Sequence, residues 1–482
     1  MEMDLNEQTE FEGRLESIRL GGGEEKQKAQ RQRGKLLARE RIDQLLDENS
    51  FSELFRFATG KDHLPGDGVV TGIGKINDRY VCLYAQDFTV AGGTLGSMHA
   101  KKICSLMDFA YEQQMPIIGL IDSGGARIQE GIEALHGYGE IFKRNVHYSG
   151  KVPQLSIMLG PCAGGAAYSP ALSDAIFMVK RISQMFITGP KVLQAISGET
   201  MTSEELGGTN VHETKSGLAH FVAETEEEAF EQVRTFLSYL QEKTIKVRQG
   251  EKPQEIEACL PKSECDVYNV KDIISCIADE QQLFELSKGY AKNMVTAFIR
   301  LNGETVGVVA NNPLHLAGCI DIDASDKGAR FVRFCHCFSI PILVLEDVSG
   351  FIPGKDQERK GLLRHGAKLI YAFAEATVPK ITVILRKAYG GAFVALNSKG
   401  IGADFVAAWP GASIAVMGRQ STKSILAEMN TTDSHSPYEA AEQGYIDDVI
   451  CPQDTRTYVI DRFACLQHKC LEDKRHSGNM PM

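Results

Sequence analysis

The sequence lacks the short motifs that mark several common kinds of catalytic or metal site. It contains no HExxH metalloprotease pattern and no Walker A phosphate-binding loop. None of its 12 cysteines forms a CxxC pair, so the cysteine spacing does not indicate a zinc ribbon or a dithiol redox motif. Cys335 and Cys337 flank His336 in an apolar stretch that we expect to be helical, where buried thiols of a reducing compartment explain them better than metal ligation.

Excess positive charge and long apolar runs are also missing. The 482 residues carry 52 basic and 63 acidic side chains, a formal net charge of −11, which gives no support for a nucleic-acid partner. The longest apolar runs, such as PIIGLI at 116–121, are far too short to cross a bilayer. The first 14 residues are acidic and have no apolar centre, unlike a signal peptide. We therefore expect a cytoplasmic protein with no membrane-spanning segment.

What the sequence does contain is an internal duplication. VPQLSIMLGPCAGGAAY, from Val152, matches VPKITVILRKAYGGAFV, from Val378, and further matches lie on both sides of each copy. The repeat predicts two homologous domains, 30–240 and 266–482. A polar linker, 241–265, is expected between them, and an N-terminal extension, 1–29, before them.

Each copy predicts an α/β fold. Short strands rich in Val, Ile and Leu alternate with helical segments such as 99–114 and 326–338, which favours layered sheets covered by helices. Residues 24–48 predict one charged amphipathic helix that packs on its own domain or on a neighbouring subunit. Its apolar face would consist of Leu36, Leu37, Ile42, Leu45 and Leu46.

The Gly-Gly-Ala sequences after the two repeated strands are candidate catalytic turns. One such turn would most simply be a packing feature, but two at equivalent places in duplicated domains favour a chemical role. Backbone N–H groups at the start of a helix have no partner within it, and two of them held together form an oxyanion hole. Such a hole stabilises the enolate of a thioester.

A second glycine-rich loop, DSGGARIQEG, precedes the first of these turns. Gly124, Gly125 and Ala126 would admit a bulky ligand or supply backbone donors. Arg127 either pairs with a phosphate or bridges to a nearby carboxylate. The corresponding loop of the second copy, DVSGFIPGKDQE, differs enough to indicate that the two halves bind different groups.

No acid–base constellation accompanies these loops. His99, His365 and His435 are candidates only because they are histidines, and each has a structural alternative. Two oxyanion holes without a protein base indicate a substrate that brings its own base.

Long stretches of the chain resemble the biotin-dependent acyl-CoA carboxyltransferase family. They include QDFTVAGGTLG, GPCAGGAAYSPAL, DIDASDKGARFVRFC and RHGAKLIYAFAEATVPK, and the resemblance covers nearly the whole sequence. It implies a duplicated crotonase-like fold, a β-β-α superhelix in each domain. It further implies a homo-oligomer, a hexamer of two stacked trimers, with active sites between the N-terminal domain of one subunit and the C-terminal domain of another.

The resemblance also assigns roles to the glycine turns. It implies that Gly164 and Gly165 hold the thioester oxygen of an acyl-CoA, and that Gly391 and Ala392 hold the ureido oxygen of biotin. Carboxybiotin then releases CO2, the biotin anion removes the α-proton of the acyl-CoA, and the enolate captures the CO2. No metal is implied in this subunit.

The chain departs from the family pattern in a few places. Val394 stands where many carboxylases have Asp, near the position that senses acyl-chain size. The 57–65 region is short, and about twenty residues of a charged arm are missing before PYEAA. No Ala-Met-Lys-Met biotinylation site and no ATP-binding module are present, so a biotin carboxylase and a biotin carrier must come from other subunits.

The resemblance, taken with these departures, implies three possible functions. The first is the carboxyltransferase subunit of an acyl-CoA carboxylase that accepts propionyl-CoA or a similar short-chain substrate. The second is a malonyl-CoA or methylmalonyl-CoA decarboxylase or transcarboxylase subunit that runs the reverse half-reaction, which the apolar Val394 favours. The third is a non-catalytic assembly subunit, motivated by the missing arm and opposed by the two intact glycine turns.

Overall fold

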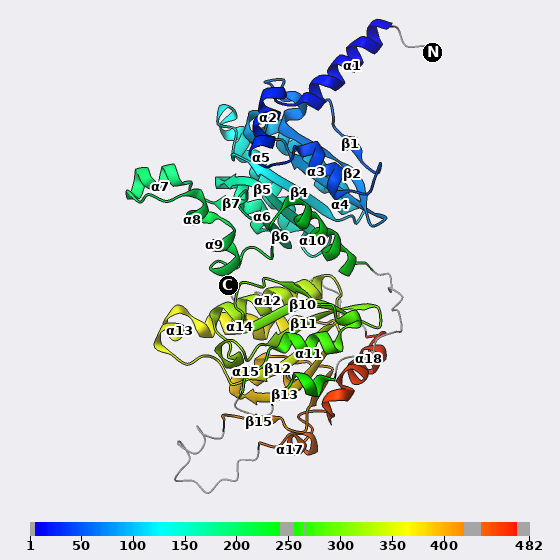
Figure 1. Ribbon diagram of the computed structural model, residues 1–482, viewed down its shortest axis with the longest axis vertical. Coiled ribbons are helices and arrows are strands. Elements are labelled where there is room, and N and C mark those ends of the chain that lie inside the picture. The colour runs from blue at the N-terminus through cyan, green and yellow to red at the C-terminus, as the bar shows by residue number, and fades with distance from the viewer. Residues whose placement is uncertain (1–4, 242–254, 262, 264–265, 419–434, 470–482) are drawn as a thin grey trace. The chain divides into compact units, whose positions relative to one another are not determined.

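The computed structural model describes residues 5–241, 255–261, 263, 266–418 and 435–469. The chain divides into two compact units, with the boundary between Ser238 and Tyr239 (Figure 1). Each unit is built around its own eight-stranded sheet. The charged arm that the sequence analysis found to be shortened falls largely within 419–434, outside the described residues.

The sheet of unit 1 has the order β1-β2-β3-β4-β5-β6-β8, and β7 pairs with β5. β1, β2 and β3 are antiparallel to one another, and the pairs from β3 onward are parallel. The strands are β1 (Ser52–Leu54), β2 (Val69–Ile76), β3 (Arg79–Gln86), β4 (Ile117–Ser123), β5 (Gln154–Ala163), β6 (Ala175–Val179), β7 (Gln184–Phe186) and β8 (Phe221–Ala223). The central strands β4 to β6 are buried almost throughout, as strands covered on both faces must be.

Helices cover both faces of this sheet. The main core cluster of unit 1 joins α4 and α5 to alternate residues of the central strands, such as Ile121 and Met158. Phe177 of β6 points the other way and stacks on Phe221 and against Phe236 of α10. The helices are α1 (Leu5–Leu20), α2 (Glu24–Gln32), α3 (Ala38–Leu45), α4 (Ser97–Glu112), α5 (Ile132–Tyr148), α6 (Tyr168–Ala171), α7 (Pro190–Ser197), α8 (Ser203–Gly207), α9 (Thr209–Thr214) and α10 (Glu226–Tyr239).

The sheet of unit 2 repeats this topology strand for strand. Its order is β16-β14-β13-β12-β11-β10-β9, and β15 pairs with β13 as β7 pairs with β5. The strands are β9 (Phe284–Leu286), β10 (Met294–Leu301), β11 (Glu304–Asn311), β12 (Ile342–Val348), β13 (Lys380–Tyr389), β14 (Phe405–Ala408), β15 (Ser413–Ala415) and β16 (Asp448–Val449). The internal repeat read from the sequence is therefore a repeat of structure as well.

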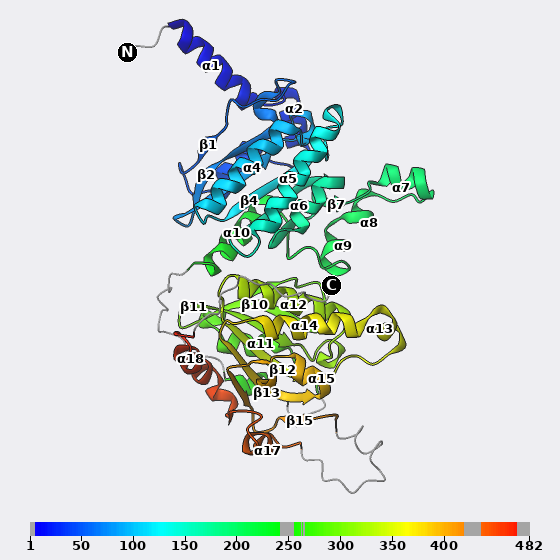
Figure 2. The same ribbon diagram turned by 180° about the vertical axis from the view of Figure 1, so that it is seen from behind.

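The helices of unit 2 are likewise divided between two faces. Leu343, Leu345 and Val383 pack with α11 and α18 in the large core of this unit. α12 and α14 lie side by side, and α12 also packs on β10 and β11 (Figure 2). The helices are α11 (Val270–Ile277), α12 (Ile322–Cys337), α13 (Lys355–Lys360), α14 (Leu362–Glu375), α15 (Gly390–Ala395), α17 (Pro437–Glu442) and α18 (Thr455–Cys465).

The expectation of one continuous helix over 24–48 is wrong. The segment forms α2 and α3, and the chain turns between them at Gly34, whose φ is +71°. Glycine adopts this left-handed conformation without steric cost, so Gly34 ends the helix. The expected apolar face nevertheless packs on its own domain, since Ile42 and Leu45 are at most 1% exposed.

The predicted α/β class with a duplicated strand–strand–helix pattern is confirmed. Among the helices that the structure describes, none is both long and apolar enough to cross a membrane.

Candidate functional site

The two Gly-Gly-Ala sequences form matching turns at the ends of matching strands. β5 ends at Ala163 and a 3-10 turn begins at Gly164; β13 ends at Tyr389 and α15 begins at Gly390. Gly164 has φ +63° and Gly390 has φ +61°. Side chains rarely tolerate this conformation, so the first glycine of each pair is required by the backbone.

The second glycine of each pair has a different reason to be there. Neither Gly165 nor Gly391 has a positive φ, so an alanine would fit the backbone at both. A Cβ on Gly165 would lie 3.2 Å from Cδ2 of Tyr138, whereas a Cβ on Gly391 would meet no atom within 4 Å. Open space, rather than crowding from the chain, therefore surrounds the side-chain position of Gly391.

Backbone donors gather at both turns. The first N–H groups of a helix or 3-10 turn find no carbonyl behind them within that turn. In unit 1 these are the N–H groups from Gly164 to Ala166, and in unit 2 those from Gly390 to Ala392. Each turn can therefore present adjacent donors to one oxygen.

The structure brings the second predicted loop against the first turn. A Cβ on Gly125, whose φ is +105°, would lie 3.0 Å from the carbonyl oxygen of Ala163. The loop is fixed from the other side, because Leu95 N donates to Gly125 O at 2.9 Å and Gly124 N donates to Gly92 O at 3.0 Å. Gly124, Gly125 and Ala126 thus form one wall beside Gly164.

Unit 2 has an equivalent loop with the same hydrogen bonds. Ile320 N donates to Gly350 O at 3.0 Å, and Ile352 N donates to Ile320 O at 2.9 Å. The matching bonds of unit 1 join Leu95 to the carbonyl of Gly125 and to the N–H of Arg127. The loops therefore share a backbone frame although their side chains differ.

Arg127 adopts the structural alternative of the two that its sequence left open. Its side chain is 3% exposed, and Nη1 lies 2.8 Å from Oδ1 of Asp67 and 2.7 Å from Oε1 of Glu130. Nη2 donates to the backbone carbonyls of Asp67 and Thr94. Because both terminal nitrogens of its guanidinium are engaged in these contacts, Arg127 stabilises the loop and is not available to bind a phosphate.

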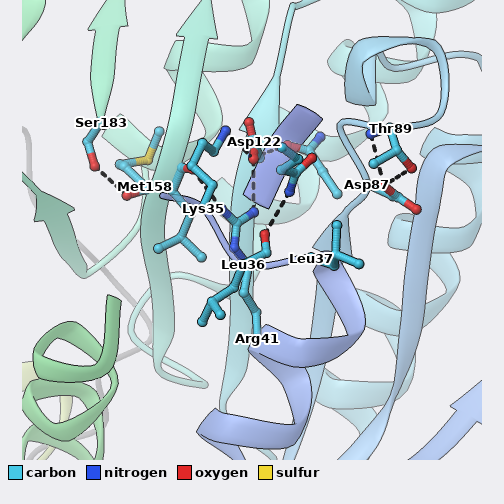
Figure 3. A network of polar contacts seen from close by, with 12 residues as sticks. Lys35, Leu36, Leu37, Arg41, Asp87, Thr89, Asp122, Met158 and Ser183 are labelled. Atoms are coloured by element: carbon cyan, nitrogen blue, oxygen red, sulfur yellow. Dashed lines mark hydrogen bonds and ion pairs between the residues drawn. The ribbon is translucent and has the colours of Figure 1, made fainter. Parts of the chain in front are cut away.

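A buried polar network that the sequence analysis missed supports the first turn (Figure 3). Asp122, near the end of β4, is fully buried; its Oδ2 lies 2.6 Å from Lys35 Nζ and 2.9 Å from Arg41 Nη1. Arg41 also pairs with Glu226 at 2.7 Å and donates to Leu159 O of β5 at 2.9 Å. Burial lowers the pKa of Lys35, and the four charges balance. Arg41 thus ties β4, β5 and α10 together just before both glycine loops.

Asp347 takes the place of Asp122 in unit 2 but has other partners. Its Oδ2 accepts from Arg386 Nε at 2.8 Å and from the Tyr268 hydroxyl at 3.0 Å, and its Oδ1 accepts from Lys387 N at 3.2 Å. The pairing of β12 with β13 shifts register between Glu346 and Val348, just as the β4–β5 pairing shifts between Ile121 and Ser123. Such bulges re-aim a strand end, and here each one directly precedes a glycine loop.

The remaining candidates divide between structural and exposed positions. His99 is fully buried, and burial with the charges of Arg127 and Lys102 lowers the pKa of His99 to about 3, so it stays neutral. His365 pairs with Asp326 at 2.8 Å on α14. Val394 lies in α15 and is 42% exposed, four residues after the first glycine of the turn.

No metal ligands accompany these loops. Within the ranges that the structure describes, no group of three or more His, Cys, Asp or Glu side chains is arranged to hold a metal ion. The chemistry these residues can offer is backbone hydrogen bonding to an oxygen that gains charge.

Comparison with known proteins identifies the family. Residues 29–435 match the carboxyl transferase domain. The chain belongs to this family. It is 51% identical to the putative propionyl-CoA carboxylase beta chain of Bacillus subtilis, over 96% of this chain and 97% of the relative. It is 46% identical to the methylmalonyl-CoA decarboxylase subunit alpha of Veillonella parvula, over 97% of both chains.

A solved structure supports the same assignment. The transcarboxylase 12S hexamer with methylmalonyl-coenzyme A and methylmalonic acid bound matches with a TM-score of 0.95 and 43% identity, covering 100% of both chains. The duplicated crotonase-like fold expected from the sequence is thereby confirmed. The expectation that this chain is an enzyme, a carboxyltransferase, is confirmed as well.

Proposed function

We propose that this carboxyl transferase is a subunit of a biotin-dependent acyl-CoA carboxylase and moves CO2 between carboxybiotin and the α carbon of a short-chain acyl-CoA resembling propionyl-CoA. The observation that carries the proposal is the pair of glycine turns, with φ +63° at Gly164 and +61° at Gly390, at equivalent strand ends of duplicated domains. The names of the relatives, including propionyl-CoA carboxylase beta chains, support the substrate class.

The first turn is assigned to the acyl-CoA. The N–H groups of Gly164 and Gly165 would donate to the thioester oxygen, which gains negative charge when the α-proton leaves. Donors fixed in advance stabilise that charge without reorganising, and one such donor contributes about 10²–10³ to kcat. Gly124, Gly125 and Ala126, packed against Ala163, would line the thioester and keep side chains out of its path. Arg127 would act here only by holding this loop.

The second turn is assigned to biotin. A Cβ on Gly391 would meet nothing within 4 Å, so the turn has room for a flat ring to approach the N–H groups of Gly391 and Ala392. Bound there as carboxybiotin, the ring would supply the CO2 and the base. The chain itself binds the ureido oxygen and aligns the ring with the acyl-CoA. Val394, in the same short helix, is proposed to contact the acyl chain.

The domains would share this work. Residues 30–240 would bind acyl-CoA and residues 266–482 would bind biotin, with 241–265 as linker and 1–29 as extension. We propose that the protein acts as a homo-hexamer in the cytoplasm, with each site shared between subunits. The hexamer assembly of transcarboxylase 12S supports this arrangement. A biotin carboxylase and a biotin carrier would come from separate subunits.

Decarboxylation is the second candidate. The 46% identity to a methylmalonyl-CoA decarboxylase subunit alpha and the apolar Val394 favour it. The same two turns would then stabilise the same enolate, formed by loss of CO2 instead of loss of a proton.

Substrate assays separate these functions. Purified protein is supplied with the carboxylated biotin carrier and with acetyl-, propionyl- or butyryl-CoA, and separately with methylmalonyl-CoA and free biotin. We expect propionyl-CoA or a longer substrate to have a higher kcat/KM than acetyl-CoA, and Val394→Asp to change that ratio. Transfer only from methylmalonyl-CoA would favour the decarboxylase, and no transfer in either direction would contradict the proposal.

A further inference from the structure

Two cysteine thiols from separate elements of unit 2 face each other. Cys259 ends the 3-10 turn Ile256–Cys259, and Cys276 lies in the last turn of α11. Their Sγ atoms are 3.5 Å apart, although the residues are 17 positions apart in the chain. Cys276 is 3% exposed, whereas Cys259 is partly exposed, so Cys259 is the more accessible residue of the pair.

The contact is held by packing around it. Ile256, in the same turn as Cys259, is 5% exposed and belongs to the core cluster that includes Ile273 and Ile277 of α11. Cys259 and Leu260 pack against that cluster from its edge. The turn is therefore anchored on α11, with the thiol of Cys259 held in contact with that of Cys276.

We propose that Cys259 and Cys276 are a redox pair that closes to an intrachain disulfide by exchange with a small-molecule disulfide such as oxidised glutathione. In the first step the Cys259 thiolate attacks one sulfur of the oxidant and releases one glutathione thiolate. In the second, Cys276 loses its proton and its sulfur attacks Cys259 Sγ, releasing the second glutathione. Both cysteines are oxidised by one electron each, and one glutathione disulfide is reduced to two thiols.

The order of these steps follows from exposure and charge. The oxidant reaches Cys259 first because Cys276 is covered. Burial, followed by the hydrogen bond and charge interaction with Cys259, raises the pKa of the Cys276 thiol to about 12, which keeps it protonated in the reduced pair. Capping Cys259 removes its negative charge and so makes ionisation of Cys276 easier just when it must attack.

The bond would tie the start of unit 2 to α11. It closes a loop from 259 to 276, and cross-linking a loop of this length restrains its opening. We expect amide exchange in 255–277 to slow about tenfold or more on oxidation. This role is separate from carboxyl transfer and does not depend on the proposed function.

The chain offers two internal controls. Cys335 and Cys337 are close in sequence, but α12 carries them on different sides, Cys335 fully buried. Cys451 is exposed and precedes the 3-10 turn Pro452–Asp454, which contacts the turn of Cys259. Among the cysteines that the structure describes, Cys451 is thus the competitor best placed to capture an oxidised Cys259.

The test uses the full-length protein. It is reduced, exposed to oxidised glutathione, trapped with iodoacetamide and mapped by peptide mass spectrometry. We expect a Cys259–Cys276 linked peptide that disappears on reduction. Cys276→Ser should stop at the mixed disulfide with glutathione on Cys259, Cys259→Ser should leave Cys276 as a thiol, and Cys451→Ser should match the wild type.

The contrary results are equally definite. If wild-type Cys259 stays a mixed disulfide, or links to Cys451 instead, the pairing is wrong. If Cys259→Ser does not prevent modification of Cys276, the assigned order of attack is wrong. If the linked peptide forms but amide exchange in 255–277 is unchanged, the disulfide does not restrain this segment. The proposed stabilising effect of the bond is then wrong.

Discussion

The turn after β5 and the turn after β13 both begin with a glycine of positive φ, but the strand ends before them are held by different side chains. Asp122 is neutralised by Lys35 and Arg41, which come from the N-terminal segment far away in the chain. Asp347 is neutralised mainly by Arg386, from the neighbouring strand β13. The backbone geometry has been kept through the duplication, while the means of fixing it has diverged. This is expected if the turns themselves are what the chemistry needs.

The largest difference between the two units should be in how much stability each loses when the arginine that pairs with its buried aspartate is replaced. Arg41 is 1% exposed and serves two buried carboxylates, so Arg41→Met should lower the free energy of unfolding by about 3–5 kcal/mol. Arg386 is 15% exposed, and Asp347 keeps its bonds from Tyr268 and Lys387, so Arg386→Met should cost only about 1–3 kcal/mol. Urea denaturation of both variants measures this, and equal losses would contradict the comparison.

A second difference lies one residue before each aspartate. Ile121 of β4 lines a cavity of about 20 Å³ beside Ala166, and Glu346 takes the matching position on β12. Glu346 is fully buried, and neither carboxyl oxygen has a hydrogen-bond partner among the residues that the structure describes. Burial, reinforced by the charge of Asp347, raises the pKa of Glu346 well above its usual value.

The raised pKa of Glu346 predicts the direction in which the free energy of unfolding changes with pH. Between the unfolded pKa and the folded pKa only the folded state holds the proton, so the free energy of unfolding falls as pH rises. Glu346→Gln removes that loss, so its stability relative to wild type should grow as the pH rises from about 5 to about 7. Denaturation at several pH values measures it. Parallel stability profiles for the two proteins would show that Glu346 is ionised in the fold.

The smallest difference concerns two buried lysines at equivalent places. Lys102 donates to the carbonyls of Gly66 and Val69, and Lys327 to those of Ser287 and Tyr290. Burial lowers the pKa of Lys102 to about 8 and that of Lys327 to about 7.

The lowered pKa values of these lysines affect the pH dependence of stability in the direction opposite to that of Glu346. Above the folded pKa the unfolded state holds more protons, so each lysine makes the free energy of unfolding rise with pH up to its unfolded pKa. Between pH 7 and pH 8 the rise due to Lys327 should be about 1 kcal/mol, and that due to Lys102 about a third of it. Lys327→Met and Lys102→Met should lose these slopes. If the two substitutions changed the pH dependence of the free energy of unfolding by the same amount, the two lysine sites would not differ.

Local sequence signals were enough to locate the turns. Gly-Gly-Ala shortly after an alternating apolar strand, present twice, placed both turns correctly, and in the structure β5 and β13 run directly up to them, ending at Ala163 and Tyr389. The contact between the two loops of unit 1, where a Cβ on Gly125 would lie 3.0 Å from the carbonyl oxygen of Ala163, was not predicted, although the ends of neighbouring parallel strands lie at one edge of a sheet.

The supporting network could not be found in the same way. Arg41 pairs with Asp122 81 residues away and with Glu226 185 residues away, and nothing local distinguishes Arg41 from Arg39, whose side chain is 30% exposed. The break at Gly34 was missed because the charged pattern continues across it. One signal was available and was overlooked: the aspartate recurs at the same point of both repeats, in LIDSGG and LEDVSG.

The central claim is that each glycine turn presents backbone donors to a reacting oxygen, and Gly391 tests it most directly. Its φ permits any side chain, and an added Cβ meets no atom of the chain within 4 Å, so Gly391→Val should fold as the wild type does. The measurement is the rate of carboxyl transfer from the carboxylated biotin carrier to propionyl-CoA, with acyl-CoA affinity measured alongside. The account predicts a loss of about 10²–10³ in kcat or more, with unchanged acyl-CoA affinity. A folded variant that keeps its rate within about threefold of wild type would contradict it.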